Sequence, residues 1–310
     1  MPAAALLDAA SRGEARAAGR LISLVERGGP AETAVAAATF GPSGRAWVVG
    51  VTGPPGAGKS SLVDRVVALV RASGQTVAVV AVDPSSPLSG GAILGDRLRM
   101  QAHATDPGVF IRSMATRGQS GGLARATLGA VRVLDAAGWP WVVVETVGAG
   151  QVEVDVAQAA DTTVVVVNPG WGDAVQAVKA GLLEVADVLV VNKADRPGAD
   201  ETVRDLELAL DLAPEPPPWR PPVVRTVATT GQGTDELWDA LARHRAYLAA
   251  DGRLAARRRS RLEAEVRRLV EQDGARAAWE RCEGRPFTEV MDEVAARRLD
   301  PLSAAARLFP

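Results

Sequence analysis

The segment GPPGAGKSS, residues 53–61, combines glycines with a lysine and two hydroxyl side chains. It matches the pattern G-x-x-x-x-G-K-[ST] and follows a β-branched run, WVVGVT, as a phosphate-binding loop (P-loop) requires. In such a loop, backbone N–H groups turn toward phosphate oxygens at the start of a helix. Lys59 is expected to reach the β and γ phosphates, and the Ser60 hydroxyl is expected to ligate Mg²⁺. An ordinary glycine-rich turn is the alternative, and it rarely gives a complete match in this context. The predicted phosphate-binding residues are Gly53, Pro54, Pro55, Gly56, Ala57, Gly58, Lys59, Ser60 and Ser61.

A second run, WVVVET, ends with a carboxylate at Glu145. In P-loop proteins, a carboxylate at the end of a neighbouring strand helps to hold Mg²⁺, directly or through water. Ligands of open α/β sheets also bind at the carboxyl ends of the strands. We therefore expect Glu145 at the metal, and the backbone N–H of Gly148 at the γ-phosphate. The glutamate replaces the commoner aspartate, and its extra methylene leaves room for a water between carboxylate and ion.

The run VVNKAD ends another strand and carries the N-K-x-D arrangement of guanine-binding proteins. The carboxylate of Asp195 can accept hydrogen bonds from N1–H and the 2-amino group of guanine, a donor pair that adenine lacks. GTP is therefore favoured over ATP, because adenine would leave the carboxylate unpaired. Lys193 is expected to cover the base plane, and Asn192 to tie this loop to the P-loop. The backbone N–H of Ala228 or Thr229, in VATTGQG, is the predicted donor to guanine O6. An exposed Asn-Lys-Asp turn is the alternative interpretation.

Strand-like and helix-like segments alternate around these motifs. This alternation predicts an α/β fold with a mostly parallel sheet that is covered by helices on both faces. Strands are expected to begin at Trp47, Thr76, Trp141, Thr162, Asp187 and Val223. Helices are expected after Gly58, near Gly121, at Asp173, near Asp200 and at Thr234. The expected domains are an N-terminal helical extension (1–42), a P-loop G domain (43–250) and a C-terminal helical dimerisation arm (251–310).

Composition limits the classes of partner. The 310 residues are 47% hydrophobic and carry a formal net charge of −2, so no overall basic field favours nucleic acid or an anionic membrane. The basic run RLAARRRSRLEAEVRRL, from Arg253, is interspersed with glutamates, as is typical of a solvated helix face. There is one cysteine, Cys282, and no apolar run of transmembrane length, so we expect a cytoplasmic protein. His103 and His244 lack companions at metal-ligand spacing.

Three longer segments indicate one particular family of GTPases. They are VAVDPSSPLSGGAILGDRLRM from Val80, FIRSMATRGQSGGLARAT from Phe110 and VVVETVGAGQVEVD from Val142. With the nucleotide motifs, they resemble the G-protein chaperones of adenosylcobalamin-dependent acyl-CoA mutases, the MeaB/ArgK type. The resemblance implies a G domain of the SIMIBI class, which includes nickel-inserting and signal-recognition GTPases. It also implies homodimerisation through the C-terminal helices, and slow GTP hydrolysis coupled to cofactor loading and protection of a partner mutase.

The resemblance also implies roles for residues outside the P-loop. Asp83 and Asp96 correspond to acidic residues of the family's magnesium site, where they would join Ser60 and Glu145. Asp83 is also suited to initiating an Asp-Pro turn, and Asp96 to capping a helix. If the protein is a kinase, Asp83 is the candidate base for the acceptor hydroxyl.

The segment GWGDAVQAVKAG, from Gly170, resembles the family's mobile, partner-responsive segment. Lys179 corresponds to a lysine that would neutralise transition-state charge, as an arginine finger does. A solvent-facing position on a helix is the alternative for Lys179. Trp171 replaces a glycine of the family pattern. We expect this difference to affect either the mobility of the loop or the identity of the mutase partner.

Three functions follow from these observations. The first is a homodimeric, Mg²⁺-dependent GTPase that binds GTP and GDP and serves a B12-dependent acyl-CoA mutase. The second is a kinase of a transport-related protein. The third is a nickel-insertion GTPase, which the absence of a histidine-rich tract disfavours. The sequence does not single out one mutase among the methylmalonyl-, isobutyryl-, 2-hydroxyisobutyryl- and ethylmalonyl-type enzymes.

Overall fold

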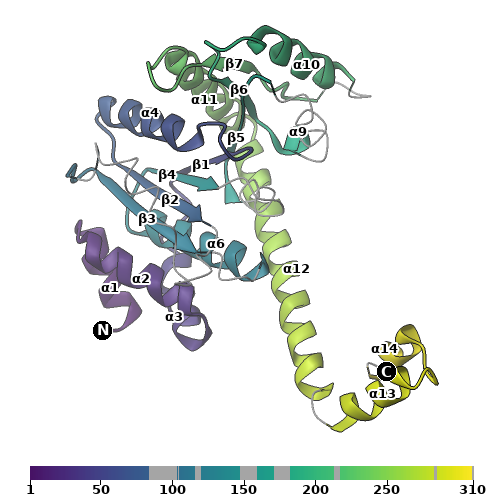
Figure 1. Cartoon of the computed structure of the whole chain (residues 1–310). Coiled ribbons are helices and arrows are strands. Elements are labelled where there is room, and N and C mark those ends of the chain that lie inside the picture. The colour runs from purple at the N-terminus through teal and green to yellow at the C-terminus, as the bar shows by residue number, and fades with distance from the viewer. Residues whose placement is uncertain are drawn as a thin grey trace. The chain divides into compact units, whose positions relative to one another are not determined.

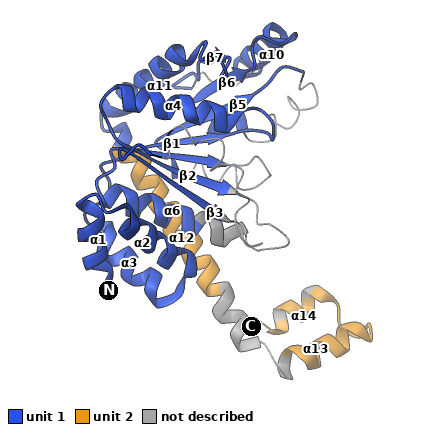
Figure 2. Cartoon of the chain, turned by 60° about the vertical axis from the view of Figure 1, so that its left-hand side comes forward, with its two compact units in different colours: residues 1–254 blue, residues 255–310 orange. Residues whose placement is uncertain are grey.

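The computed structural model describes residues 1–83, 103, 105–115, 120–146, 159–170, 182–212, 217–282 and 285–308. It divides into two compact units, Met1–Leu254 and Ala255–Pro310 (Figure 2). The predictions for Asp96, Gly148, Trp171 and Lys179, and for the helix at Asp173, lie outside the described residues. The three-part division of the chain stays a prediction.

The first unit is built on one sheet, which in the described residues has seven strands. The strand order is β3-β2-β4-β1-β5-β6-β7, and every pair of neighbours is parallel (Figure 1). The predicted parallel α/β sheet is therefore confirmed. The strands are β1 (Trp47–Thr52), β2 (Val77–Asp83), β3 (Val109–Ala115), β4 (Trp141–Thr146), β5 (Thr162–Val167), β6 (Val188–Asn192) and β7 (Val223–Thr226).

The central strands are buried on both faces, which explains their continuous β-branched composition. All six residues of β1, of β4 and of β5 are buried. Neighbouring residues of β1 alternate between two cores, so that Val48 packs with one cluster and Val49 with the other. Each cluster includes helices, and the sheet is therefore the middle layer of three.

Helices cover both faces of the sheet (Figure 1). One face packs against α1 (Ala3–Ser11), α2 (Ala15–Arg27), α3 (Gly29–Phe40) and α6 (Ser120–Ala136). The other face packs against α4 (Lys59–Ala72) and α11 (Thr234–Ala249). The short α9 (Leu182–Val185) and α10 (Ala199–Asp211) pack beside β5 and β6.

Buried and partly buried polar contacts hold the N-terminal helices and the sheet together. The carboxylate of Asp135 accepts hydrogen bonds from the backbone N–H groups of Gly44, Arg45 and Ala46, at 2.6 to 3.1 Å. Ion pairs join Arg112 of β3 to Glu26, and Arg125 of α6 to Glu32. The helices α1 to α3 therefore belong to the same packed unit as the sheet.

The second unit is helical. It contains most of α12 (Arg253–Cys282), with α13 (Arg285–Ala295) and α14 (Pro301–Leu308). Buried Val290 and Ala304 lie on α13 and α14, and an ion pair joins Arg307 to Glu293 at 2.9 Å. In the part of the chain that the structure describes, no helix is long and apolar enough to span a membrane.

The structure corrects the predicted elements at one place. β3 was not predicted, because Arg112 and Ser113 interrupt its apolar run. Among the described residues, β3 is the outermost strand of the sheet and pairs only with β2. An edge strand buries less of its surface than a central strand, so its sequence carries a weaker strand signal.

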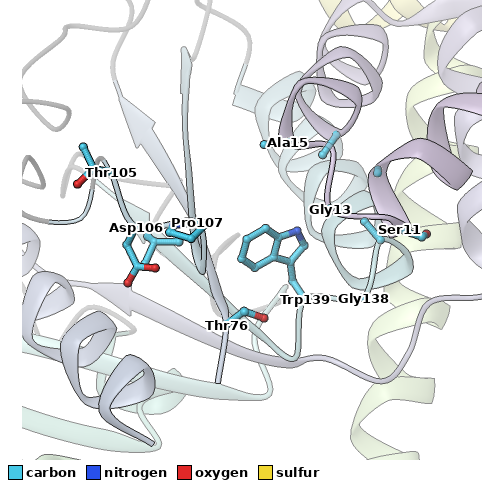
Figure 3. Close-up of a pocket in the computed structure, with 13 residues that line it drawn as sticks. Ser11, Gly13, Ala15, Thr76, Thr105, Asp106, Pro107, Gly138 and Trp139 are labelled. Atoms are coloured by element: carbon cyan, nitrogen blue, oxygen red, sulfur yellow. The ribbon is translucent and has the colours of Figure 1, made fainter. Parts of the chain in front are cut away.

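A cavity of about 500 Å³ lies at the amino ends of the strands. Its walls include Trp139, just before β4, and Thr76, just before β2 (Figure 3). The P-loop follows the carboxyl end of β1, so this cavity and the predicted nucleotide site lie at opposite edges of the sheet.

Candidate nucleotide site

The predicted metal-site residues Ser60 and Glu145 meet, although they are 85 positions apart in the sequence. The Ser60 hydroxyl donates to Oε1 of Glu145 at 2.6 Å, and both residues are buried. Their approach follows from the parallel register, in which Val51 pairs with Glu145, because the P-loop leaves β1 beside the end of β4. The hydroxyls of Thr52 and Thr146 also meet across these strands, at 3.1 Å.

The P-loop conformation requires its glycines. Gly53 has φ 133°, and a Cβ at this position would lie 2.0 Å from the carbonyl oxygen of Val166. Gly58 has φ 91°, and a Cβ would lie 2.3 Å from Nδ2 of Asn192. No other residue type fits such contacts at positive φ. The loop therefore passes close to the ends of both β5 and β6.

Lys59 begins α4 at the centre of the site. Its side chain is buried, and its Nζ donates to the carbonyl oxygens of Gly53 and Pro54, at 2.7 and 2.8 Å. These bonds hold the ammonium inside the loop that the phosphates are predicted to occupy. The backbone amides at the start of α4 add the partial positive charge of a helix N-terminus.

Asn192 ties three segments together, as the sequence predicts for the P-loop. Its Nδ2 donates to the carbonyl oxygen of Ala57 at 2.8 Å. Its Oδ1 accepts from the hydroxyl of Thr226 and from the backbone N–H of Ala228, each at 3.1 Å. The P-loop, the end of β6 and the loop after β7 are thereby held at one edge of the sheet.

The other two residues of the guanine-binding motif, Lys193 and Asp195, differ from each other in their contacts. Lys193 has φ 59°, and its Nζ donates to the carbonyl oxygen of Gly56 at 2.6 Å. Asp195 is exposed in the turn between β6 and α10. Of the two predicted amide donors, Ala228 is buried and already bonded to Asn192, whereas Thr229 is exposed. A guanine bound here would therefore find Asp195 and Thr229 accessible.

The oxygen donors at this edge fit a magnesium ion. Mg²⁺ prefers hard oxygen ligands, and the hydroxyl of Ser60 and the carboxylate of Glu145 supply two of them side by side. Asp83 ends β2, the strand next to β4. Within the described ranges, no group of three or more His, Cys, Asp or Glu side chains forms a metal cluster. A P-loop magnesium does not need one, because phosphates and water complete its coordination.

The structure adds one site residue that the sequence analysis missed. Arg65 of α4 donates from Nε to the carbonyl oxygen of Ala228 at 2.7 Å, and from Nη2 to that of Thr229 at 2.8 Å. The only signal in the sequence is a basic residue six positions after Lys59, which is not part of the P-loop pattern. The contact needs the folded arrangement of α4 beside the loop after β7.

A parallel three-layer α/β fold, a P-loop after its central strand and an N-K-x-D motif at the same edge define a P-loop GTPase. The model of the family "Methylmalonyl Co-A mutase-associated GTPase MeaB" matches residues 18–283. The chain belongs to this family, which confirms the resemblance seen in the motifs.

Relatives agree with this assignment. A protein of Pyrococcus abyssi, provisionally named a GTPase, is 50% identical over 97% of this chain and 94% of its own. GTPase ArgK of Escherichia coli is 39% identical over 73% of this chain and 69% of its own. The mitochondrial methylmalonic aciduria type A homolog of mouse is 36% identical over 73% of this chain and 55% of its own.

A solved structure of the same fold is also similar. The crystal structure of a LAO/AO transport system kinase is 27% identical and superposes with a TM-score of 0.76. The match covers 99% of this chain and 96% of that one. It therefore extends over both compact units of the chain.

Proposed function

We propose that this GTPase depends on Mg²⁺ and acts as the chaperone of an adenosylcobalamin-dependent acyl-CoA mutase, gating cofactor loading and protecting the mutase. The family match over residues 18–283 carries the proposal, because the family is named for association with methylmalonyl-CoA mutase. The meeting of Ser60 with Glu145 supports the nucleotide half of the proposal, because it supplies oxygen ligands beside the P-loop.

Triphosphate binding would use the P-loop amides and Lys59. When phosphate enters, the ammonium exchanges the carbonyl oxygens of Gly53 and Pro54 for β and γ phosphate oxygens. The exchange is favourable because it replaces neutral carbonyl acceptors of the ammonium with negatively charged phosphate oxygens, which adds the attraction of opposite charges. The N–H of Gly148 would contact the γ-phosphate. GDP, the product, keeps all of these contacts except those to the γ-phosphate.

Mg²⁺, when bound, neutralises charge on the β and γ phosphates. Ser60 would ligate it directly, and Glu145 directly or through water. We assign Asp83 and Asp96 to the same site, on the basis of the family resemblance and of Asp83's place at the end of β2.

Guanine selection would depend on Asp195. Its exposed carboxylate accepts from N1–H and the 2-amino group, while Lys193 covers the base and Thr229 or Ala228 donates to O6. Asn192 does not need to touch the base, because its bonds to Ala57 and Ala228 already fix the phosphate-binding loop and the loop that carries Thr229.

The mutase would act on the segment from Gly170 to Gly181. Lys179 is proposed to stabilise the charge that develops during hydrolysis, once the partner has positioned it. Trp171 is proposed to adapt this segment to one particular mutase.

Self-association would use the C-terminal unit. Leu262, Val266 and Val270 recur every four residues on α12 and are 40%, 60% and 67% exposed. Charged residues flank this apolar stripe, among them Arg259, which pairs with Glu263. Such a pattern is typical of a helix that packs against another helix, here that of a second copy. We propose a cytoplasmic homodimer that binds neither nucleic acid nor membrane.

The deciding experiment measures release of free phosphate from GTP, with and without candidate mutases. We expect Mg²⁺-dependent hydrolysis that one mutase accelerates, and Lys179→Ala should keep the basal rate while losing the acceleration. Absence of acceleration by every adenosylcobalamin-dependent mutase tested would contradict the chaperone role. Transfer of labelled γ-phosphate to a protein would favour a kinase, the function in the name of the similar solved structure. Tight nickel binding by the purified chain would favour nickel insertion.

A further inference from the structure

Arg65 links the helix of the P-loop to the loop that is expected to read guanine O6. It is half-buried on α4, and its guanidinium donates to two consecutive carbonyl oxygens, those of Ala228 and Thr229. The two bonds are 2.7 and 2.8 Å long. One planar guanidinium with fixed donor directions can hold two peptide units in one orientation, which a lysine cannot do.

These bonds determine where the Thr229 amide points. In a trans peptide unit, the C=O of one residue and the N–H of the next lie on opposite sides of the chain. Because Arg65 holds the Ala228 carbonyl on the side of α4, the Thr229 N–H in the same peptide unit points away from Arg65. The next unit follows the same rule, and its Thr230 N–H donates to the carbonyl of Val227 at 3.0 Å inside the turn.

The amides on either side of Thr229 in this turn already donate hydrogen bonds within the protein. The Ala228 N–H is engaged by Asn192 Oδ1, and the Gly231 N–H donates to the Val227 carbonyl at 2.9 Å. Gly231 has φ 86°, and a Cβ there would lie 4.0 Å from Cζ of Arg65. A side chain at position 231 would therefore lie beside the guanidinium.

We propose that Arg65 is a positioning residue for purine selection: it orients the Thr229 N–H toward the 6-oxo group of the base. This inference rests on the proposed guanine site. The inference extends the proposed guanine site, because recognition of O6 then depends on a residue of α4. This helix begins at the phosphate-binding Lys59. The alternative is that Arg65 only stabilises the loop between β7 and α11.

The test compares nucleotides that differ in the 6-position of the base. GTP and ITP carry an oxygen there, whereas 6-thio-GTP carries sulfur, a weak acceptor, and keeps N1–H and the 2-amino group. Arg65→Met should weaken binding of GTP and ITP about five- to tenfold, the range of one hydrogen bond, and that of 6-thio-GTP at most about twofold. Arg71→Met, on the same helix but paired with Asp106, is the matched control and should leave all three affinities unchanged.

Equal losses for the three nucleotides, or no loss for any, would overturn the positioning role. If Arg65→Met does not fold, Arg65→Lys tests the same difference, because its ammonium cannot span both carbonyl groups. Wild-type protein without preference for GTP over ATP would contradict the proposed guanine site itself. A selective wild type whose Arg65 variants lose the three nucleotides equally would contradict only the inference about Arg65.

Discussion

The absence of a side chain at Gly58 lets the P-loop pack against the base-binding loop. Gly58 leaves room for Asn192, because a Cβ at Gly58 would lie 2.3 Å from the Asn192 amide that bonds to Ala57. Gly56 shares the positive φ but has open space around the position of a Cβ. The two glycines therefore separate the cost of backbone strain from the cost of a clash.

We predict that Gly58→Ala weakens nucleotide binding by more than tenfold and lowers the Tm more than Gly56→Ala does. Both variants carry the strain of a left-handed alanine, about 1–2 kcal/mol. Only Gly58→Ala must also displace Asn192. Calorimetric unfolding and GTP titration of both variants test this, and equal effects would show that the Asn192 contact is unimportant.

A substitution of Asp195 tests how the site selects guanine over other bases. Asp195→Asn removes the carboxylate that accepts two guanine donors, so GTP affinity should fall about ten- to a hundredfold. Xanthine nucleotides should gain affinity, because the new amide can donate to the 2-oxo group, and hydrolysis of the bound nucleotide should persist. Asp200→Asn, another exposed acid nearby, is the control. Unchanged preference for GTP in Asp195→Asn would rule out this role.

At the scale of elements, the sequence predicted the central strands and the edge of the sheet at which the motifs meet. Continuous β-branched runs mark strands that are buried on both faces, and the parallel arrangement brings their carboxyl ends together. β3 escaped prediction because it is an edge strand with polar residues. The contact of Arg65 could not be predicted either, since it depends on how α4 packs beside a loop about 160 residues further along. Motif residues such as Asn192 can be assigned an orienting role from sequence, but Arg65 belongs to no motif and is found only in the folded structure.

The start of β3 is held by an ion pair that gives a pH-dependent prediction. Arg71 of α4 donates from Nε to Asp106 at 2.8 Å, and Asp106 also accepts from the Gly108 N–H. The hydrogen bond from Arg71, followed by that from Gly108, lowers the pKa of Asp106. A lowered folded-state pKa stabilises the protein above the unfolded-state pKa, about 3.9, and this contribution disappears as the pH falls through the folded-state value.

Asp106→Asn should therefore lower the Tm at pH 7, and the difference from wild type should shrink as the pH falls below about 4. Asp211→Asn, in an exposed pair with Arg220, should change the Tm little at any pH. Thermal unfolding across this pH range tests the prediction. A difference for Asp106→Asn that does not change with pH would contradict the ionic explanation.

For the whole molecule, the question is whether the chain functions as a pair. The apolar stripe of Leu262, Val266 and Val270 predicts association through α12. Val266→Glu should convert a dimer into a monomer of 32.2 kDa and leave GTP binding intact. Gln272→Glu places the same charge on another face of α12 and should leave the dimer unchanged. Light scattering after size exclusion measures both, and a dimeric Val266→Glu protein would place the interface elsewhere.

A crystal structure with Mg²⁺ and a non-hydrolysable GTP analogue tests the central claim most directly. The account predicts the triphosphate in the loop from Gly53 to Ser61, with Lys59 on the β and γ phosphates, Ser60 on the metal and Asp195 on the guanine edge. A nucleotide bound at any other place on the molecule, or a guanine that does not contact Asp195, would contradict it.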